Sequence, residues 1–361
     1  MDWERTNYAY FVDVVAVHQT DVNTVLGFLS GVELEGMSIS ENYYSDSRVQ
    51  AKLSTYAKEG TSDGYVKNAR LRIILSIPSK TWLKEMVTGY VSDINESTSN
   101  GYTKRTYTIE GTIWGLLNHK IKSPVIINKG AKMSKIWSSL IADQTRMQYS
   151  MDGMQDHTFG NTIVYEVGTV LSTILFEVSS GYSRMDVDGR GTLTLKKYVS
   201  PSNREFSRIV SFDSFKSLAI RPLEMSSSEY EAPGRAIVTA TVSNTDSNGK
   251  TTQQVIYGSY DAPAVHPSSI EVRGWLKARS DTYSGTSEKP TSSELAAIAK
   301  KNWENDQEEK REWSASSVFA DYHAGDILML ILPDNSFVKV LLKAVETDLS
   351  SFTQKLTMKE V

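Results

Sequence analysis

The sequence predicts a mainly β fold with an α+β insert: two tube-like antiparallel β-barrel modules plus a small helix-containing domain. Two observations lead to this fold class. Apolar and polar side chains alternate in short runs through residues 1–118 and again through 206–361, as they do in half-buried strands. Between these regions, in residues 119–205, apolar side chains recur with the period of an amphipathic helix. We therefore expect three parts in this 361-residue chain.

Residues 1–118 are expected to form the N-terminal β-barrel module. In the clearest strand, aliphatic side chains occupy every second position, at Leu71, Ile73, Leu75 and Ile77. Similar runs predict further strands at residues 9–17, 49–55, 85–94 and 104–111. Polar turns such as residues 99–101 separate these runs, which is typical of an antiparallel barrel or sandwich.

Residues 119–205 are expected to form the α+β insert with two amphipathic helices. The first apolar stripe has the spacing of one buried helix face and consists of Met133, Ile136, Trp137, Leu140 and Ile141. The second stripe consists of Leu171, Ile174, Leu175 and Val178. Both follow a Gly-x-x-[Met/Leu]-Ser-x-Ile sequence, and its two copies begin at Gly130 and Gly168, 38 residues apart. This spacing indicates a duplication.

The chain after the second helix is expected to turn back as a hairpin near residues 185–195. Gly181 supplies a left-handed stop for the helix. The Asp-Val-Asp-Gly sequence that ends at Gly189 also resembles the start of a calcium loop, but the EF-hand spacing requires a Glu about six residues later, where leucine stands. We therefore interpret Gly189 as a hairpin residue with a positive φ.

Residues 206–361 are expected to form the second β-barrel module with one helix, at about 291–306. Thr291 and Glu294 have the spacing of a capping box, which predicts the start of that helix. The chain is predicted to end in a meander of strands at residues 327–332, 336–345 and 353–359. In an alternative assignment, the first strand of this region, near residues 206–212, completes the first barrel instead.

Composition narrows the classes of function. The 39 basic and 43 acidic residues give a net charge of −4, so the chain has no basic field with which to hold a nucleic acid by its phosphates. No secretory signal and no apolar stretch long enough for a membrane span are visible, so we expect synthesis in the cytosol and a soluble protein. The absence of cysteine excludes disulfides and thiolate chemistry.

From the sequence we expect no catalytic, cofactor-binding or metal-binding residues. The five histidines are scattered and form no His-x-x-x-His pair; they are His18, His119, His157, His266 and His323. Phosphate-binding loops, dinucleotide turns and nucleophile elbows do not occur. A glycosidase pair has no fixed spacing, so strand-end acids stay candidates for it: Asp13, Glu33, Glu35, Glu110 and Asp321.

The order of elements resembles the baseplate hub or tail-associated proteins of tailed bacteriophages, a superfamily shared with the hubs of contractile injection and type VI secretion spikes. The resemblance extends over nearly the whole chain. It rests on the strand at 86–91, the strand-to-helix passage at 107–117, the insert segments at 168–175 and 188–195, the helix at 294–299, and His323-Ala324-Gly325-Asp326 with the strand that follows.

This resemblance implies a structural virion protein of the tail tip, made in the host cytoplasm and without enzymatic activity or cofactor. Three copies, each with two barrel-like modules, would present six modules to a sixfold tail tube. The implied partners are two further copies, tail tube or distal tail protein rings, the C-terminus of the tape-measure protein, and a spike or receptor-binding fibre. DNA would pass through the lumen without sequence-specific binding.

Two alternatives remain at this stage. A carbohydrate-binding or glycan-cleaving β protein is compatible with the seven Trp and eighteen Tyr, because aromatic faces stack on sugars. A hub of a contractile injection or secretion apparatus would have the same sequence features as a phage hub.

Overall fold

The computed structural model describes residues 9–45, 47–60, 66, 69–211, 219–226, 233–245, 251–266, 268–283, 290–307, 312–332 and 334–361. The chain forms two compact units. The first consists of Met1–Glu224 and Trp313–Val361, and the second is Met225–Glu312.

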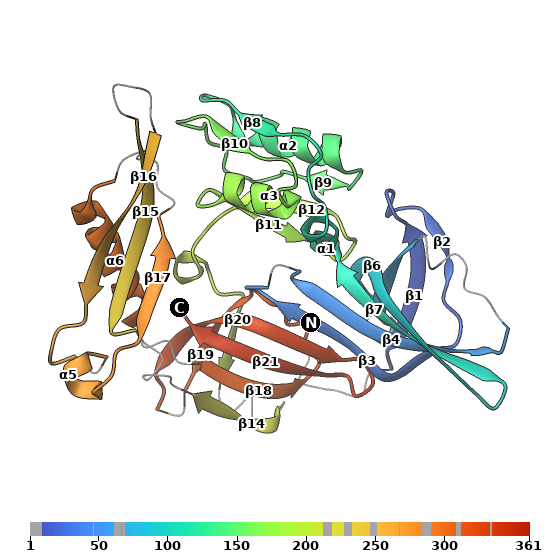
Figure 1. The fold of residues 1–361 in the computed structure, drawn as a ribbon. Helices are drawn as coiled ribbons and strands as arrows, with labels where there is room; N and C mark the ends of the chain where they lie inside the picture. Colours follow the sequence, from blue (N-terminus) through green and yellow to red (C-terminus); the bar gives the residue numbers. More distant parts are fainter. Residues whose placement is uncertain are drawn as a thin grey trace. The chain divides into compact units, whose positions relative to one another are not determined.

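A 13-stranded sheet is the basis of the first unit (Figure 1). Its N-terminal strands are β1 (Phe11–His18), β2 (Val25–Phe28), β3 (Val32–Asn42), β4 (Val49–Lys58), β5 (Ala69–Ile77), β6 (Trp82–Ser99) and β7 (Tyr102–Gly111). Its C-terminal strands are β13 (Arg208–Ser211), β14 (Ala219–Ser226), β18 (Glu312–Val318), β19 (Ile327–Ile331), β20 (Phe337–Asp348) and β21 (Thr353–Glu360). The strand order is β14-β18-β21-β20-β3-β4-β7-β6-β5-β1-β2, with β19 beside β20 and β13 beside β19.

Pairing of β3 with β20 joins the two groups of strands into one sheet. The antiparallel register runs from Ala344 opposite Asn42 to Asp348 opposite Ser38. A single apolar core includes side chains from both groups, such as Ile39 and Ile109 from the N-terminal strands and Leu342 from the C-terminal ones. Because burial of this shared core is the main stabilising contribution, neither group of strands is expected to be stable without the other.

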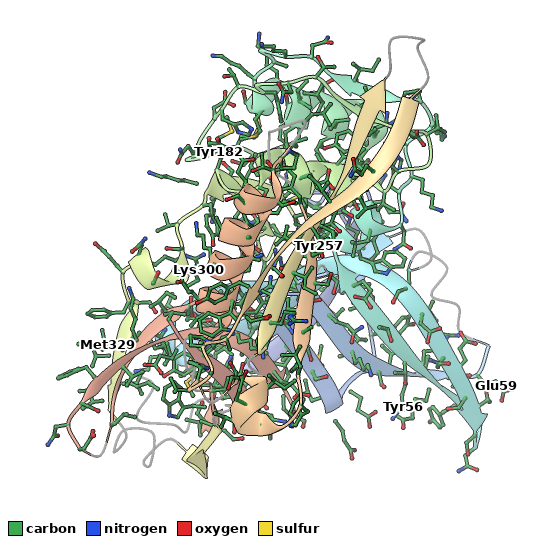
Figure 2. The ribbon with its side chains drawn as sticks, turned by 60° about the vertical axis from the view of Figure 1, so that its left-hand side comes forward. Tyr56, Glu59, Tyr182, Tyr257, Lys300 and Met329 are labelled. Atoms are coloured by element: carbon green, nitrogen blue, oxygen red, sulfur yellow. The ribbon has the colours of Figure 1, made fainter. Side chains whose placement is uncertain are left out.

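The long hairpin of β6 and β7 continues past the first residue of β3, Val32, and β4 runs alongside it. Lys58 in β4 lies opposite Tyr102, and the amide of Glu59 donates to the carbonyl of Gly101. Figure 2 shows Tyr56 and Glu59 beside the tip of this hairpin.

The insert follows β7 and contains three α-helices and five short strands. Its helices are α1 (Thr112–Leu117), α2 (Met133–Gln144) and α3 (Leu171–Ser179). Its strands are β8 (Val125–Ile127), β9 (Tyr149–Ser150), β10 (Ile163–Tyr165), β11 (Ser183–Val187) and β12 (Leu193–Lys197). The 3-10 helices η2 (Pro78–Lys80) and η3 (Pro201–Asn203) precede and follow this region. Both predicted apolar stripes face one separate core, in which Trp137 and Leu175 are fully buried.

The structure extends the 38-residue repeat beyond its sequence pattern. The Met133 amide at the start of α2 donates to the carbonyl of His157 (2.9 Å), and the Leu171 amide at the start of α3 donates to that of His119 (2.8 Å). A shift of 38 residues converts Met133 into Leu171 and His119 into His157, so the two hydrogen bonds are equivalent. The same shift relates β8 to β10, and these two strands pair with each other. Each copy therefore supplies backbone acceptors to the other, so neither copy is complete alone.

The second unit is a three-stranded sheet with a helix on one face. The strand order is β16 (Thr251–Asp261), β15 (Arg235–Thr245), β17 (Ala278–Thr282), and the helices are α5 (Ile270–Arg273) and α6 (Ser292–Gln307). The predicted capping box is present, since the Glu294 carboxylate accepts from the Thr291 amide (2.7 Å) and Thr291 Oγ1 accepts from the Glu294 amide (3.2 Å). Figure 2 shows α6, with Lys300, beside β16, with Tyr257.

A mainly β fold with a helix-containing insert is thus confirmed. The C-terminal meander is present as β19, β20 and β21. The division at residues 118 and 205 stays a prediction, and the second compact unit falls inside the expected third part. The strand near residues 206–212 corresponds to β13, which pairs with β19 of the C-terminal group, while Phe212 lies outside the described residues.

Candidate functional site

A cavity of about 250 Å³ lies in the first unit, between the sheet and the insert. The end of β3, the start of β6, strand β11 and the loop before β19 form its walls. Most of the side chains that line it are polar or charged. The charged groups around this cavity form the candidate site.

One side of the cavity carries a cluster of four ionisable groups from three separate parts of the chain. His323 is central: its Nδ1 lies 2.8 Å from Glu41 Oε1, and its Nε2 lies 2.9 Å from Asp321 Oδ1. Lys84 Nζ donates to the same Asp321 oxygen at 2.8 Å. The arrangement pairs two carboxylates with two basic groups, so the charges are balanced within the cluster.

The electrostatics of the cluster favour the charged forms of His323 and Asp321. Burial alone would lower the pKa of His323, but the negative charge of Glu41 and hydrogen bonds to Asp321 and Glu41 raise it to about 10. Burial would raise the pKa of Asp321, yet hydrogen bonds from His323 and Lys84 hold it below its ordinary value. Asp321 is therefore a poor proton donor near neutral pH, unlike the acid of a glycosidase.

A rigid loop presents Asp321 and His323. Gln354 is fully buried in β21, and its Oε1 accepts from the backbone amides of Ala320 and Tyr322. The carboxylate of Asp326 accepts from the His323 amide at 3.0 Å, which closes the turn before β19. Asp321 itself has a positive φ of 55°. These contacts hold the loop against the end of the sheet.

Two buried arginines of the sheet, Arg70 and Arg72, connect it to the β11–β12 hairpin of the insert, whose Gly189 lines the cavity. Arg70 Nη1 donates to the carbonyl of Gly191 and Arg72 Nη2 to that of Arg190, both at 3.3 Å. Thr88 Oγ1 donates to the carbonyl of Gly189 at 2.7 Å. Because three successive carbonyls of the turn are satisfied by the sheet, the hairpin is fixed at the cavity wall.

The turn corrects the interpretation of Gly189. The hairpin itself is confirmed by the pairing of β11 with β12. The positive φ, however, belongs to Gly191 (85°) and not to Gly189. A Cβ on Gly189 would overlap the backbone carbonyl of Glu85 in β6. Glycine is required there because two backbones approach closely, which local turn chemistry does not reveal.

Replacing Gly189 by alanine is therefore expected to lower the free energy of unfolding by about 2–3 kcal/mol, because the turn must move away from β6. Urea unfolding of the full chain measures this change in the free energy of unfolding. Gly160→Ala is the matched control in the same insert, since a Cβ there would meet nothing within 4 Å, and it should leave stability nearly unchanged. Equal stability of the two variants would contradict a close approach between the backbones of Gly189 and Glu85.

The five candidate acids lie on different parts of the first unit. Asp13 and Glu35 are exposed on β1 and β3. Glu33 accepts from Lys104 at 3.0 Å and Glu110 from Gln50 at 2.6 Å. Asp321 alone of these five contacts the cavity-lining Lys84 and His323.

Sequence reasoning missed Glu41 and Lys84 in the cavity lining, and it missed the buried Arg70 and Arg72 that hold the neighbouring hairpin. The useful signal was the Ile39-x-Glu41-x-Tyr43 alternation, which places Glu41 on the buried face of its strand. Of the histidines, His323 alone borders the cavity, and His157 stacks on Tyr182 in the insert. Within the described ranges, no three His, Asp or Glu side chains are arranged to hold a metal ion. The expectation of no catalytic, cofactor or metal residues stays a prediction.

No helix in the described part of the chain is long and apolar enough to cross a membrane.

No protein-family model and no curated protein matches the sequence. Solved structures do match over nearly the whole chain. A tail protein from Neisseria meningitidis MC58 superimposes with a TM-score of 0.64 at 10% identity, covering 98% of this chain and 97% of its own. The 43 kDa tail protein of prophage MuSo2 from Shewanella oneidensis gives 0.62 at 9% identity, covering 98% of both chains. The chain has the fold of these tail proteins.

Two further structures extend the likeness. The prophage tail protein gp18 from Listeria monocytogenes EGD-e gives a TM-score of 0.53 at 9% identity, over 96% of this chain and 94% of its own. A chain of the Francisella PdpA–VgrG complex gives 0.55 at 10% identity, over 99% of this chain but 53% of its own. The resemblance to tail and hub proteins is thereby confirmed at the level of the fold.

Proposed function

We propose that the chain is a structural protein of a tail tip: a homotrimeric hub that adapts a sixfold tail tube to a threefold tip and lines the channel for DNA ejection. The observation that carries this proposal is the fold likeness to tail proteins, which covers nearly all of both chains. In this role the partners are tube or distal tail protein rings, the tape-measure C-terminus, and a spike or fibre. The site of action is the virion.

The architecture of the first unit supports an assembly role. Two groups of strands share one sheet through β3 and β20, and this arrangement supports the proposal that each chain contributes two strand-built modules to the assembly. Three such chains offer six modules around an axis. A closed ring of this kind also covers strand edges that would otherwise pair with other proteins.

Exposed apolar side chains on the outer sheet face are suited to contacts between subunits. Phe11 in β1 and Leu83 in β6 lie in one row across Ser76 of β5, and they are 58% and 65% exposed. Phe28 in β2 lies on the same face through its pairing with Val15 and is 67% exposed. Burying such side chains in an interface is favourable by about 1.5–3 kcal/mol each.

The cavity chemistry favours structure over catalysis. Glu41 in the cavity lining and Asp321 beside it are both engaged by His323, and the pKa of Asp321 is lowered. A glycosidase that works through two carboxyl groups would need one acid that stays protonated near neutral pH. We therefore expect no wall-degrading activity, and a zymogram of the pure protein tests this expectation.

Light scattering coupled to size-exclusion chromatography tests the assembly. The expected molar mass is three times that of the 40.3 kDa chain, and electron microscopy should show a threefold ring with a central opening. Phe11→Glu with Leu83→Glu is expected to shift the protein toward monomer, whereas Tyr102→Glu, at the tip of the β6–β7 hairpin, is the matched control. A protein that stays monomeric at all concentrations and is absent from purified virions would contradict the proposal.

A hub of a contractile injection or secretion apparatus is the second candidate, favoured by the likeness to a chain of the Francisella PdpA–VgrG complex. Proteomics of purified phage particles separates the two, because a phage hub is a virion component.

A further inference from the structure

The strand β16 is an edge of the three-stranded sheet in the second unit. It is eleven residues long, and among the described strands it pairs with β15 alone. β17 pairs with the other side of β15, so β15 is central and β17 is the second edge. A strand edge presents a row of backbone N–H and C=O groups that another β-strand can satisfy. The chemistry of the β16 edge therefore fits an extended polypeptide segment.

The other edge strands that the structure describes are short or blocked. β2, β13, β17 and the edge strands of the insert have five residues or fewer. β14 has eight, but its sequence contains Arg221, Pro222 and Glu224. Shortness, proline and charge keep a sheet edge from pairing with other chains. β16 contains no proline, and its one charged side chain, Asp261 at its last residue, is paired with Arg235 of β15.

The exposed side chains of β16 are also suited to a neighbouring strand. α6 packs on one face of the sheet, where a Cβ on Gly258 would overlap the backbone of Ala296. Because side chains alternate along a strand, Val255 and Tyr257 lie on the opposite face, and they are 66% and 64% exposed. Cross-strand pairs with β-branched and aromatic side chains stabilise a sheet.

The opposite edge of the same sheet, β17, offers a complementary surface. Its two charged side chains, Arg279 and Asp281, pair with each other at 2.8 Å, and Asp281 accepts a hydrogen bond from α6 at 2.9 Å. The residues of β17 on the other face are small and exposed: Ala278, Ser280 and Thr282. A contact between two different surfaces of identical copies runs head to tail and can close into a ring.

We propose that β16 of one copy pairs with β17 of a neighbouring copy, so that the second units of three copies are joined edge to edge. This inference rests on the homotrimer proposed above and names one of its contacts. The five residues of β17 pair with part of β16, and the backbone hydrogen bonds between them hold neighbouring copies together. The long edge of β16 is thereby covered in the assembly.

Engineered cysteines test the pairing, because the chain has no cysteine of its own. Val255 and Ser280 lie on the same face but on opposite edges of one sheet. Two strand spacings, about 9–10 Å, separate these edges, which exceeds the roughly 7 Å that a disulfide can bridge. In the variant Val255→Cys with Ser280→Cys, a disulfide can therefore form only between copies. After oxidation we expect covalent dimers and trimers on a non-reducing gel.

Neighbouring positions allow for the register of the pairing. Tyr257→Cys and Ser259→Cys, each combined with Ser280→Cys, place the thiol further along the same face of β16. Thr241→Cys with Ser280→Cys is the matched control: Thr241 is exposed directly opposite Val255, but on the central strand β15, so no linked species is expected. Linkage in Val255→Cys alone would show that β16 pairs with itself about a twofold axis, which overturns the proposal.

A lysine on the edge gives a second test. Val255→Lys places a charge beside the incoming strand, and we expect it to raise the dissociation constant of the trimer at least about tenfold in light scattering. Thr241→Lys puts the same charge on the same face of the central strand and should leave the constant unchanged. Circular dichroism of both variants checks folding.

The outcomes separate this inference from the proposed function. A wild-type protein that stays monomeric contradicts the homotrimer itself. A wild-type trimer in which none of the three cysteine pairs links, or in which the two lysine variants dissociate equally, overturns the pairing of β16 with β17 and leaves the homotrimer standing.

Discussion

Replacing Arg70 by alanine is expected to lower the free energy of unfolding by about 3–5 kcal/mol. The side chain is 1% exposed in β5 and has no carboxylate within ion-pair distance among the described residues. It is held by Tyr90 Oη (2.5 Å), Thr112 Oγ1 (3.3 Å) and the Gly191 carbonyl, and it stacks on the Tyr90 ring at 4.4 Å. Truncation leaves both a cavity and unpaired polar groups at the junction of sheet and insert.

The comparison with Arg70→Met separates packing from charge. Burial lowers the pKa of Arg70, because desolvation opposes the charged form of the side chain. Methionine fills most of the volume without that cost, so we expect it to recover a large part of the stability lost in Arg70→Ala. Urea unfolding monitored by tryptophan fluorescence gives both values.

Arg190→Ala is the control at the same junction, because its side chain is 60% exposed and its ion pair with Glu85 lies at the surface. Its expected cost is below about 1 kcal/mol. The account of Arg70 is contradicted if Arg70→Ala is as stable as Arg190→Ala.

His323→Gln is expected to remove a pH-dependent contribution to stability. The pKa of His323 is about 10 in the folded chain against an ordinary value of 6.5. A raised pKa means that the charged imidazole stabilises the fold fully below about pH 6.5. This contribution is lost as the pH rises toward 10. At pH 7, breaking the contacts to Glu41 and Asp321 should cost about 2–4 kcal/mol.

Unfolding of the wild type and the variant should therefore be compared at several pH values from 6 to 10. The difference in unfolding free energy is expected to be largest near pH 6 and to shrink toward pH 10. His18→Gln is the control, because it replaces an exposed histidine at the end of β1 that lies outside the charged cluster. A difference that stays constant over this range would show that the charge of His323 does not contribute.

Local sequence patterns predicted the helices and strands whose apolar side chains lie on one buried face. The stripe of Met133, Trp137, Leu140 and Ile141 became the buried face of α2, and Leu71 to Ile77 became buried positions of β5. These predictions succeed because the periodicity of a helix or strand follows from backbone geometry alone. The strand β2, by contrast, has four residues, two of them with more than half of the side chain exposed, and carries little periodic signal.

The candidate site could not be predicted in the same way. Glu41 and His323 are 282 residues apart, and Lys84 and Asp321 are 237 apart. Only the pairing of β3 with β20 and the packing of the 319–326 loop bring them together.

The sequence by itself determined the mainly β composition, the two amphipathic helices with their 38-residue repeat, and the capped helix α6. These features depend on side chains a few residues apart, whose relation is set by local geometry. Tertiary structure alone decided that the first and last strands form one sheet, that Gly189 meets the backbone of β6, and that buried charges gather between sheet and insert. Such contacts arise from the burial of apolar surface by distant segments, and no local pattern encodes which segments will meet.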